Sequence, residues 1–267
     1  MPFRHLLSDQ SSLTQDDVLR LGELTAEWQL LADLSFADLV LWIPKRQDQK
    51  SWPEGHRAVA QIRPMTAATV FTHDLIGNEV TWGSRTDLDQ ALSSGEIIRD
   101  NRAEQVGEIE IKVECIPVLF LGRVIAVISR HRNLETMRTP SRLELNYREI
   151  ANHIYRMIAE GNFPVKDNVY LAEAAPRVGD GLVRVNVSGE VLFASPNARS
   201  ALNRVGWDKD LEGQNFGQVL DSLVSPISPL NPKEENWQIS MSGKQLRREE
   251  FENSGGVLDL LAIPLTE

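Results

Sequence analysis

Side chains that could do chemistry are few in this sequence and are spread along it. The histidines and the single cysteine share no spacing and stand at His5, His56, His73, Cys115, His131 and His153. No segment matches a phosphate-binding glycine loop, a zinc-binding HExxH pair or a nucleophile elbow. No acid–base pair and no nucleophile beside a base can be recognised either. We therefore predict no catalytic residue and no metal site, which favours binding or signalling over catalysis.

Individual positions support this interpretation. His131 follows a predicted strand, so we interpret it as a surface-loop residue and not as a phosphate acceptor on a helix. His153 is predicted on the surface of a helix, and Cys115 is predicted as a small core residue within a strand. The acids at 108, 110 and 114 alternate with apolar residues, and acids two apart on a flat strand spread instead of converging on a metal.

The composition is that of an ordinary globular protein. Of the 267 residues, 42% are hydrophobic and 25% are charged, and this length is typical of two domains. The net charge of -10 argues against nucleic acid and against an anionic membrane surface as partners. A single cysteine excludes a disulfide framework and suits a reducing compartment. Because no signal peptide and no run of about 18 apolar residues is found, we expect a cytoplasmic protein without a membrane segment.

Amphipathic helices begin and end the first predicted domain, residues 1–160. Thr14 is a suitable N-cap for a helix that should run to about Ala32. A longer helix of four to five turns should begin after Thr139 or Ser141, either of which can cap it. We expect both helices to lie on the same side of a sheet.

Apolar runs and alternating patterns predict the strands of that sheet. Ala37–Ile43 is apolar and short, so it is interpreted as a buried strand that ends at Pro44. One or two helical turns are expected at 87–92. The other strands are expected at 57–62, 68–72, 108–116, 118–121 and 124–129.

A hairpin followed directly by a helix predicts the start of a second domain, residues 178–267, after a linker at 161–177. Two β-rich runs flank the turn at 186–189, and Ser195 with Pro196 supplies the cap and first residue of the helix. The apolar face and end of this helix are assigned to Leu202, Val205 and Gly206. Further along, the patterns predict a proline-rich loop at 223–232 and two strands at 246–251 and 257–265. Residues 233–242 fit either a strand or a helical turn.

Several strings resemble known signalling families. Residues 181–198, which contain SGEVLFASPNA, resemble the start of a PAS domain, and residues 115–128 with the helix after them resemble a GAF domain. The whole chain resembles the sensory region of the actinobacterial cytosolic two-component sensor histidine kinase that is paired with an RNA-binding antiterminator response regulator. The strings that carry this likeness are EWQLLADLSFAD at 27–38, MIAEGNFP at 157–164 and ASPNA at 194–198.

The resemblance implies an α+β fold of two domains, each an antiparallel sheet flanked by helices, with the GAF-like domain before the PAS-like one. It implies a region that relays a ligand or conformational signal to a kinase core lying downstream in the same polypeptide, and through that core to a response regulator. The chain itself would then lack the catalytic core of its parent, a histidine protein kinase. The alternative is a stand-alone GAF and PAS module that binds protein partners without a kinase.

The sequence does not identify the signal, and a small molecule is one candidate. If the PAS-like domain binds it, the pocket candidates are Val185, Leu192, Phe193 and Leu202, although core packing explains these four equally well. No cofactor is predicted, because this domain has no histidine for haem and no cysteine for a flavin adduct. Cys115 could anchor a bilin only from a mid-strand position, which disfavours it. The long helix could form a homodimer seam or only cover the sheet through Leu143, Tyr147, Ile150, Ile154 and Met157.

Overall fold

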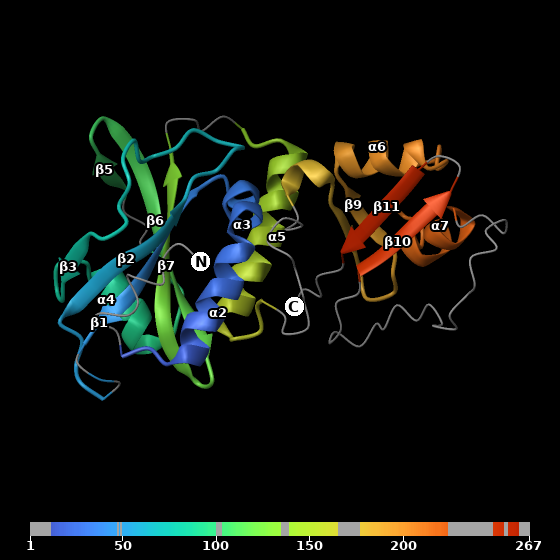
Figure 1. The fold of residues 1–267 in the computed structure, drawn as a ribbon. Coiled ribbons are helices and arrows are strands. Elements are labelled where there is room, and N and C mark those ends of the chain that lie inside the picture. The colour runs from blue at the N-terminus through green and yellow to red at the C-terminus, as the bar shows by residue number, and fades with distance from the viewer. Residues whose placement is uncertain are drawn as a thin grey trace. The chain divides into compact units, whose positions relative to one another are not determined.

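The chain divides into two units, and each has a hydrophobic core of its own. The computed structural model describes residues 12–46, 48, 50–99, 103–134, 139–164, 177–223, 248–253 and 256–261. The first unit comprises the described residues up to Pro164, and the second comprises those from Arg177 onward. Figure 1 shows both units, which are treated separately below.

A seven-stranded antiparallel sheet forms the centre of the first unit. Its strands follow the order β3-β2-β1-β7-β6-β4, with β5 also paired to β6. The bounds are β1 Asp38–Lys45, β2 Gly55–Ile62, β3 Glu79–Thr81, β4 Ile98–Arg99, β5 Glu104–Val106, β6 Ile109–Phe120 and β7 Arg123–Asn133. The long β6–β7 hairpin turns at Leu121 and Gly122, which both have positive φ, as a tight two-residue hairpin requires. The predicted antiparallel strands at 57–62 and 124–129 are therefore confirmed, whereas those at 108–116 and 118–121 form the single strand β6, which continues through Pro117.

Helices cover both faces of this sheet. Helices α2 (Gln15–Ala26), α3 (Trp28–Ser35) and α5 (Arg142–Ala159) lie on one face, and α4 (Thr86–Ser94) packs on β6 and β7 from the other (Figure 1). The predicted placement of the first and last helices on the same side is confirmed. Because side chains alternate along a strand, β6 and β7 present one set of residues to α5 and another to α4.

Two caps that the sequence predicts are present. Thr14 and Ser141 each form a capping box with the acid three residues later, Asp17 for α2 and Glu144 for α5. The predicted single helix to Ala32 is wrong, because the chain leaves helical hydrogen bonding at Glu27 and restarts as α3. The apolar spacing continues through this break, which is why periodicity alone does not reveal it.

Two strand predictions need correction. Pro44 does not end β1, which continues to Lys45. Strand β7 pairs with β1 only as far as Trp42, so Pro44 lies where one side of β1 has no neighbouring strand, a position that proline tolerates. Residues 68–72 form no strand, because the Asp38 carboxylate accepts the Val70 N–H that a neighbouring strand would otherwise bind.

The second unit begins as the sequence predicts. A 3₁₀ turn (Val178–Asp180) leads into the hairpin of β8 (Val183–Val185) and β9 (Val191–Ala194), and then into α6 (Pro196–Arg204) and α7 (Phe216–Leu223). Gly181 lies against α6, where an added Cβ would stand 2.6 Å from the Ala198 nitrogen.

The predicted cap and helix face of α6 are confirmed. Ser195 caps α6, Pro196 is its first residue, and Leu202 and Val205 enter the core of the second unit. A second hairpin, β10 (Arg248–Asn253) with β11 (Gly256–Leu261), overlaps the two predicted strands. The predicted loop from residue 224 onward and the ambiguous segment 233–242 lie outside the described residues.

Candidate functional site

A set of polar side chains lies between α4 and the sheet of the first unit, and all of them are buried except Asp87, which is half-buried. We call this set the polar layer. It lies within the hydrophobic cluster that α4 forms with Val40, Ala58 and Val113. Its members come from β1, β2, α4, β6 and β7 and are Trp42, His56, Asp87, Asp89, Cys115, Ser129 and His131. Burying a polar group is costly unless it is hydrogen-bonded, so the partners of each member define what the layer can do.

The centre of the layer is a chain of three hydrogen-bonded side chains. The Trp42 indole Nε1 donates to Ser129 Oγ at 2.7 Å, and His131 Nε2 lies 2.8 Å from the same hydroxyl. The Phe71 ring stands edge-on to His131 with 4.8 Å between ring centroids. The Nδ1 atom of His131 is buried without a hydrogen-bond partner in the described part of the chain.

The predicted surface-loop position of His131 is wrong, because the residue is 3% exposed and belongs to β7. Burial lowers the pKa of His131 to about 3, so its ring is neutral at physiological pH. By contrast, His153 lies half-buried on α5, where the sequence predicts a helix-surface residue.

A second cluster connects α4 to β6. Cys115 Sγ donates to Asp87 Oδ2 at 3.1 Å, and Arg85 binds both oxygens of that carboxylate at 3.1 and 2.8 Å. Burial opposes ionisation of Asp87, but the hydrogen bonds and charge of Arg85 leave its pKa below the usual value. Burial raises the pKa of the Cys115 thiol, which keeps it protonated. The predicted core position of Cys115 is confirmed.

A third cluster reaches from the layer to the surface. His56 Nε2 lies 2.7 Å from Asp89 Oδ1, and the other oxygen of Asp89 accepts from the Gly83 N–H at 2.7 Å. Trp82 stacks on His56, and the exposed Trp52 meets Trp82 edge-on at 5.0 Å. Burial lowers the pKa of His56, although Asp89 opposes this, and His56 Nδ1 has no partner in the described part of the chain.

This arrangement is suited to recognition more than to catalysis. Its only thiol is protonated and bound to a carboxylate, and its hydroxyl already binds an indole and an imidazole. No group of three or more metal-ligating side chains occurs among the residues that the structure describes. What the layer offers is two buried imidazole nitrogens without partners, beside a hydroxyl and two carboxylates. The sequence does not indicate this site, because its members come from five separate elements.

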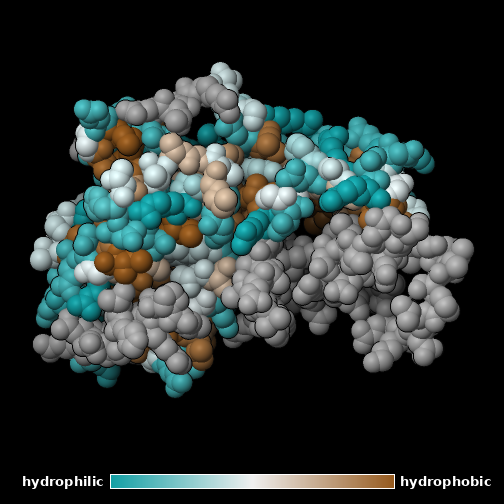
Figure 2. Space-filling view, turned by 45° about the horizontal axis from the view of Figure 1, so that its top comes forward, coloured by the Kyte–Doolittle hydropathy of each residue, from teal (hydrophilic) through white to brown (hydrophobic). Residues whose placement is uncertain are grey.

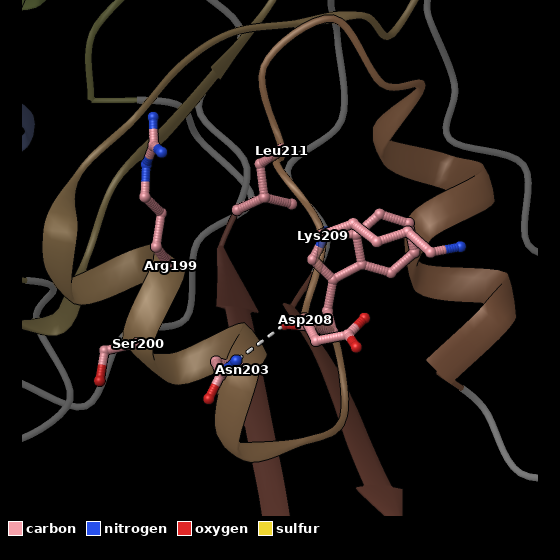
Figure 3. Close-up of a pocket in the computed structure, with 7 residues that line it drawn as sticks. Arg199, Ser200, Asn203, Asp208, Lys209 and Leu211 are labelled. Carbon is pink, nitrogen blue, oxygen red and sulfur yellow. Dashed lines mark hydrogen bonds between the residues drawn. The ribbon is translucent and has the colours of Figure 1, made fainter.

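The four pocket residues predicted in the second unit differ in their exposure. Val185 and Leu192 are 44% and 45% exposed on the hairpin, whereas Phe193 and Leu202 are buried. A shallow pocket of about 300 Å³ instead lies between α6 and the loop after it (Figure 3). None of the four lines this pocket, which is formed by Arg199, Ser200, Asn203, Trp207, Asp208, Lys209 and Leu211. A ligand-binding role of the four stays a prediction.

The apolar face of α5 is used within the first unit. Tyr147, Ile150, Ile154 and Met157 are buried there, and Leu143 is half-buried. These residues cover the sheet, so the homodimer seam stays a prediction. On the surface in view in Figure 2, hydrophobic residues form several patches separated by hydrophilic ones. No helix of the described ranges has the length and apolar character needed to cross a membrane.

Comparison with known proteins places these features in context. The family model of the GAF domain of histidine kinase PdtaS matches residues 3–151. The sensor histidine kinases PdtaS of Mycolicibacterium smegmatis and Mycobacterium tuberculosis are 35% and 36% identical over 97% of this chain. The chain spans about half, 52%, of the length of these curated relatives.

A solved structure agrees with this finding. The structure described as the sensor region of a sensor histidine kinase is 34% identical, with a TM-score of 0.80. The match covers 98% of this chain and 91% of that one.

Proposed function

Since the chain belongs to the family of PdtaS-type sensor histidine kinases and corresponds to their sensor region, we propose that it senses a signal and controls a kinase core in the same polypeptide. The match to a solved sensor region over nearly the whole chain is the observation that carries this proposal. The kinase would pass its phosphoryl group to a response regulator, an RNA-binding antiterminator, in the cytoplasm. The first unit is the GAF domain, and the hairpin and helix of the second unit favour a PAS-like domain.

We place the sensing element in the polar layer. His131 and His56 each have a buried ring nitrogen without a partner, and a small polar molecule could bind these nitrogens if the layer opened. A ligand changes an equilibrium only when it binds two states unequally. The present arrangement, in which Trp42, Ser129 and His131 bind one another, is one such state. A rearranged layer that binds the signal would be the other.

The test uses the full-length kinase and the variant Ser129→Ala. This change removes the hydroxyl that Trp42 and His131 share, and leaving buried polar groups unpaired costs about 1–3 kcal/mol. We expect the rate of autophosphorylation on histidine to change about threefold or more. Ser94→Ala is the matched control, because its exposed hydroxyl donates to the Gln90 carbonyl and accepts from the Glu96 N–H, and neither partner belongs to the polar layer.

Two results would contradict the proposal at different levels. Full-length protein that transfers no phosphoryl group from ATP to histidine would refute the kinase assignment and favour the stand-alone interaction module. A folded Ser129→Ala variant with wild-type autophosphorylation would refute the polar layer as the sensing element. Circular dichroism and thermal unfolding of both variants establish that each is folded.

A further inference from the structure

One six-residue segment of the first unit contacts two features that lie on opposite faces of the sheet. This segment, Asp33–Asp38, joins the end of α3 to the start of β1, and we call it the junction. It lies at the end of the string EWQLLADLSFAD, which contributes no residue to the polar layer. Its two aspartates are buried, with exposures of 4% and 0%. Buried carboxylates require hydrogen-bond donors, and theirs identify the first contact.

The aspartates bind the loop that follows β2, residues Arg63–Leu75, which we call the strap. Asp33 Oδ1 accepts from the Met65 N–H at 2.6 Å. Asp38 Oδ1 accepts from the Thr69 hydroxyl at 2.5 Å, and Asp38 Oδ2 accepts from the Val70 N–H at 2.8 Å. The strap is therefore held to the junction at both its beginning and its middle.

The strap in turn covers the polar layer. Val70 and Phe71 are buried in the hydrophobic cluster of α4, and the Phe71 ring stands edge-on to His131. The Phe71 N–H donates to Thr69 Oγ1 at 3.2 Å, so the hydroxyl that binds Asp38 also binds the backbone of Phe71. A movement of Phe71 away from His131 would disturb the bond between Thr69 and Asp38.

The second contact of the junction is α5. Ser35 Oγ lies 3.0 Å from the Tyr155 hydroxyl, and both groups are buried. The Phe36 ring stacks on Tyr147 with 6.3 Å between centroids. Residues 33 and 38 thus bind the strap while residues 35 and 36, between them, bind the last helix of the first unit.

Backbone strain marks the centre of this segment. Phe36 has φ of 53°, in the left-handed region, which an aromatic residue rarely adopts. Such a conformation costs about 1–3 kcal/mol and persists only while surrounding contacts hold it. Loss of the contacts on either side would therefore let the junction relax and release the other side.

We propose that the junction couples the strap over the polar layer to α5, so that displacement of Phe71 loosens the hold of Ser35 and Phe36 on that helix. The inference rests on the proposed sensory function for its biological meaning. The coupling itself is a property of the isolated chain, and it can be measured without a signal or a kinase core.

The experiment is hydrogen exchange by mass spectrometry on the 267-residue chain carrying Thr69→Val. This variant keeps the side-chain shape and removes the hydroxyl that binds Asp38 and Phe71. We expect exchange in α5 to accelerate about threefold or more, together with exchange in the strap. Thr69→Ser keeps the hydroxyl, and Thr72→Val makes the same substitution at an exposed strap residue, so both should leave α5 within about twofold of wild type.

Coupling is reciprocal, so the converse change is part of the test. Tyr155→Phe removes the hydroxyl beside Ser35 and should accelerate exchange in the strap. Acceleration confined to the strap in Thr69→Val, or an unchanged strap in Tyr155→Phe, would overturn the proposal. So would equal acceleration in the central strands β6 and β7, because that would reflect a general loss of stability. None of these results bears on whether the full-length protein is a kinase.

Discussion

At the scale of single residues, the polar layer depends on how few hydrogen-bond partners reach the His131 ring. Ser129 accepts from Trp42, so its own proton is free to go to His131 Nε2. The proton of the neutral ring then resides on Nδ1, which has no acceptor within the described ranges. A protonated ring would need two acceptors, and the site provides at most one. The geometry and the lowered pKa of His131 therefore have one cause, burial without enough partners.

This environment predicts a pH dependence of stability that originates from His131. Its pKa is about 3 when folded and 6.5 in an ordinary setting, so between these values the unfolded chain binds more protons. The contribution of His131 to the free energy of unfolding is fully present above the unfolded pKa of 6.5 and is lost as the pH falls toward 3. Relative to His131→Leu, wild type should lose about 2 kcal/mol of unfolding free energy between about pH 7.5 and about pH 5, measured by urea titration.

The difference between variants is the quantity to compare, because another buried group titrates in the opposite sense. Burial raises the pKa of Glu27 to about 7, so the contribution of this carboxyl to the stability of the folded protein is lost as the pH rises. Both groups are present in wild type, and only His131 is absent from the variant. His73→Leu, which removes an exposed histidine, is the matched control. Parallel pH curves for wild type and His131→Leu would contradict the prediction.

At the scale of elements, each unit depends on a serine that begins a helix. Ser141 Oγ accepts from the Glu144 N–H at the exposed start of α5. Ser195 Oγ accepts from the Ala198 N–H of α6 and also from the Leu182 N–H, at 2.9 Å, and its side chain is buried. Ser195 therefore links the hairpin of the second unit to its first helix, whereas Ser141 serves its own helix alone.

Replacement of these serines should have unequal effects. Ser141→Ala removes one cap, which water can partly replace, and should cost about 1 kcal/mol. Ser195→Ala leaves a second backbone donor unpaired inside the protein and should cost about 2 kcal/mol or more. Urea unfolding of both variants measures the two values. Equal losses would indicate that the Leu182 hydrogen bond contributes nothing to stability.

At the scale of the whole molecule, the two units contain separate hydrophobic clusters. The core on the α4 side of the first unit surrounds the polar layer, and the core of the second unit packs its hairpin against α6 and α7. Leu88 is fully buried in the first core and Leu202 is buried in the second. Because no residue belongs to both clusters, each should respond to its own substitutions.

Calorimetry should therefore show two transitions with independent sensitivities. Leu88→Ala and Leu202→Ala each create a cavity that costs about 2–5 kcal/mol. We expect Leu88→Ala to lower the melting temperature of one transition only, and Leu202→Ala that of the other only. A single transition that both variants shift equally would mean that the units unfold as one cooperative body.

Local patterns in the sequence are sufficient to predict the features that neighbouring residues set. Thr14, Ser141 and Ser195 begin helices because their side-chain oxygens bind N–H groups three residues ahead. Cys115 is in the core because alternation along β6 places it opposite the charged residues. These effects act over a few residues, so the chain displays them without its tertiary structure.

Long-range pairing overrides these local patterns at two places, and it becomes visible only in the folded chain. The predicted strand ended at Ser129, but β7 continues because His131 is paired with Val113 of β6 and with Asp38 of β1. That pairing buries His131 and creates the polar layer. Residues 68–72 have the composition of a strand, yet Asp38 binds Thr69 and Val70 and makes them part of the strap. In both cases the partner is distant in the sequence, and no local pattern encodes it.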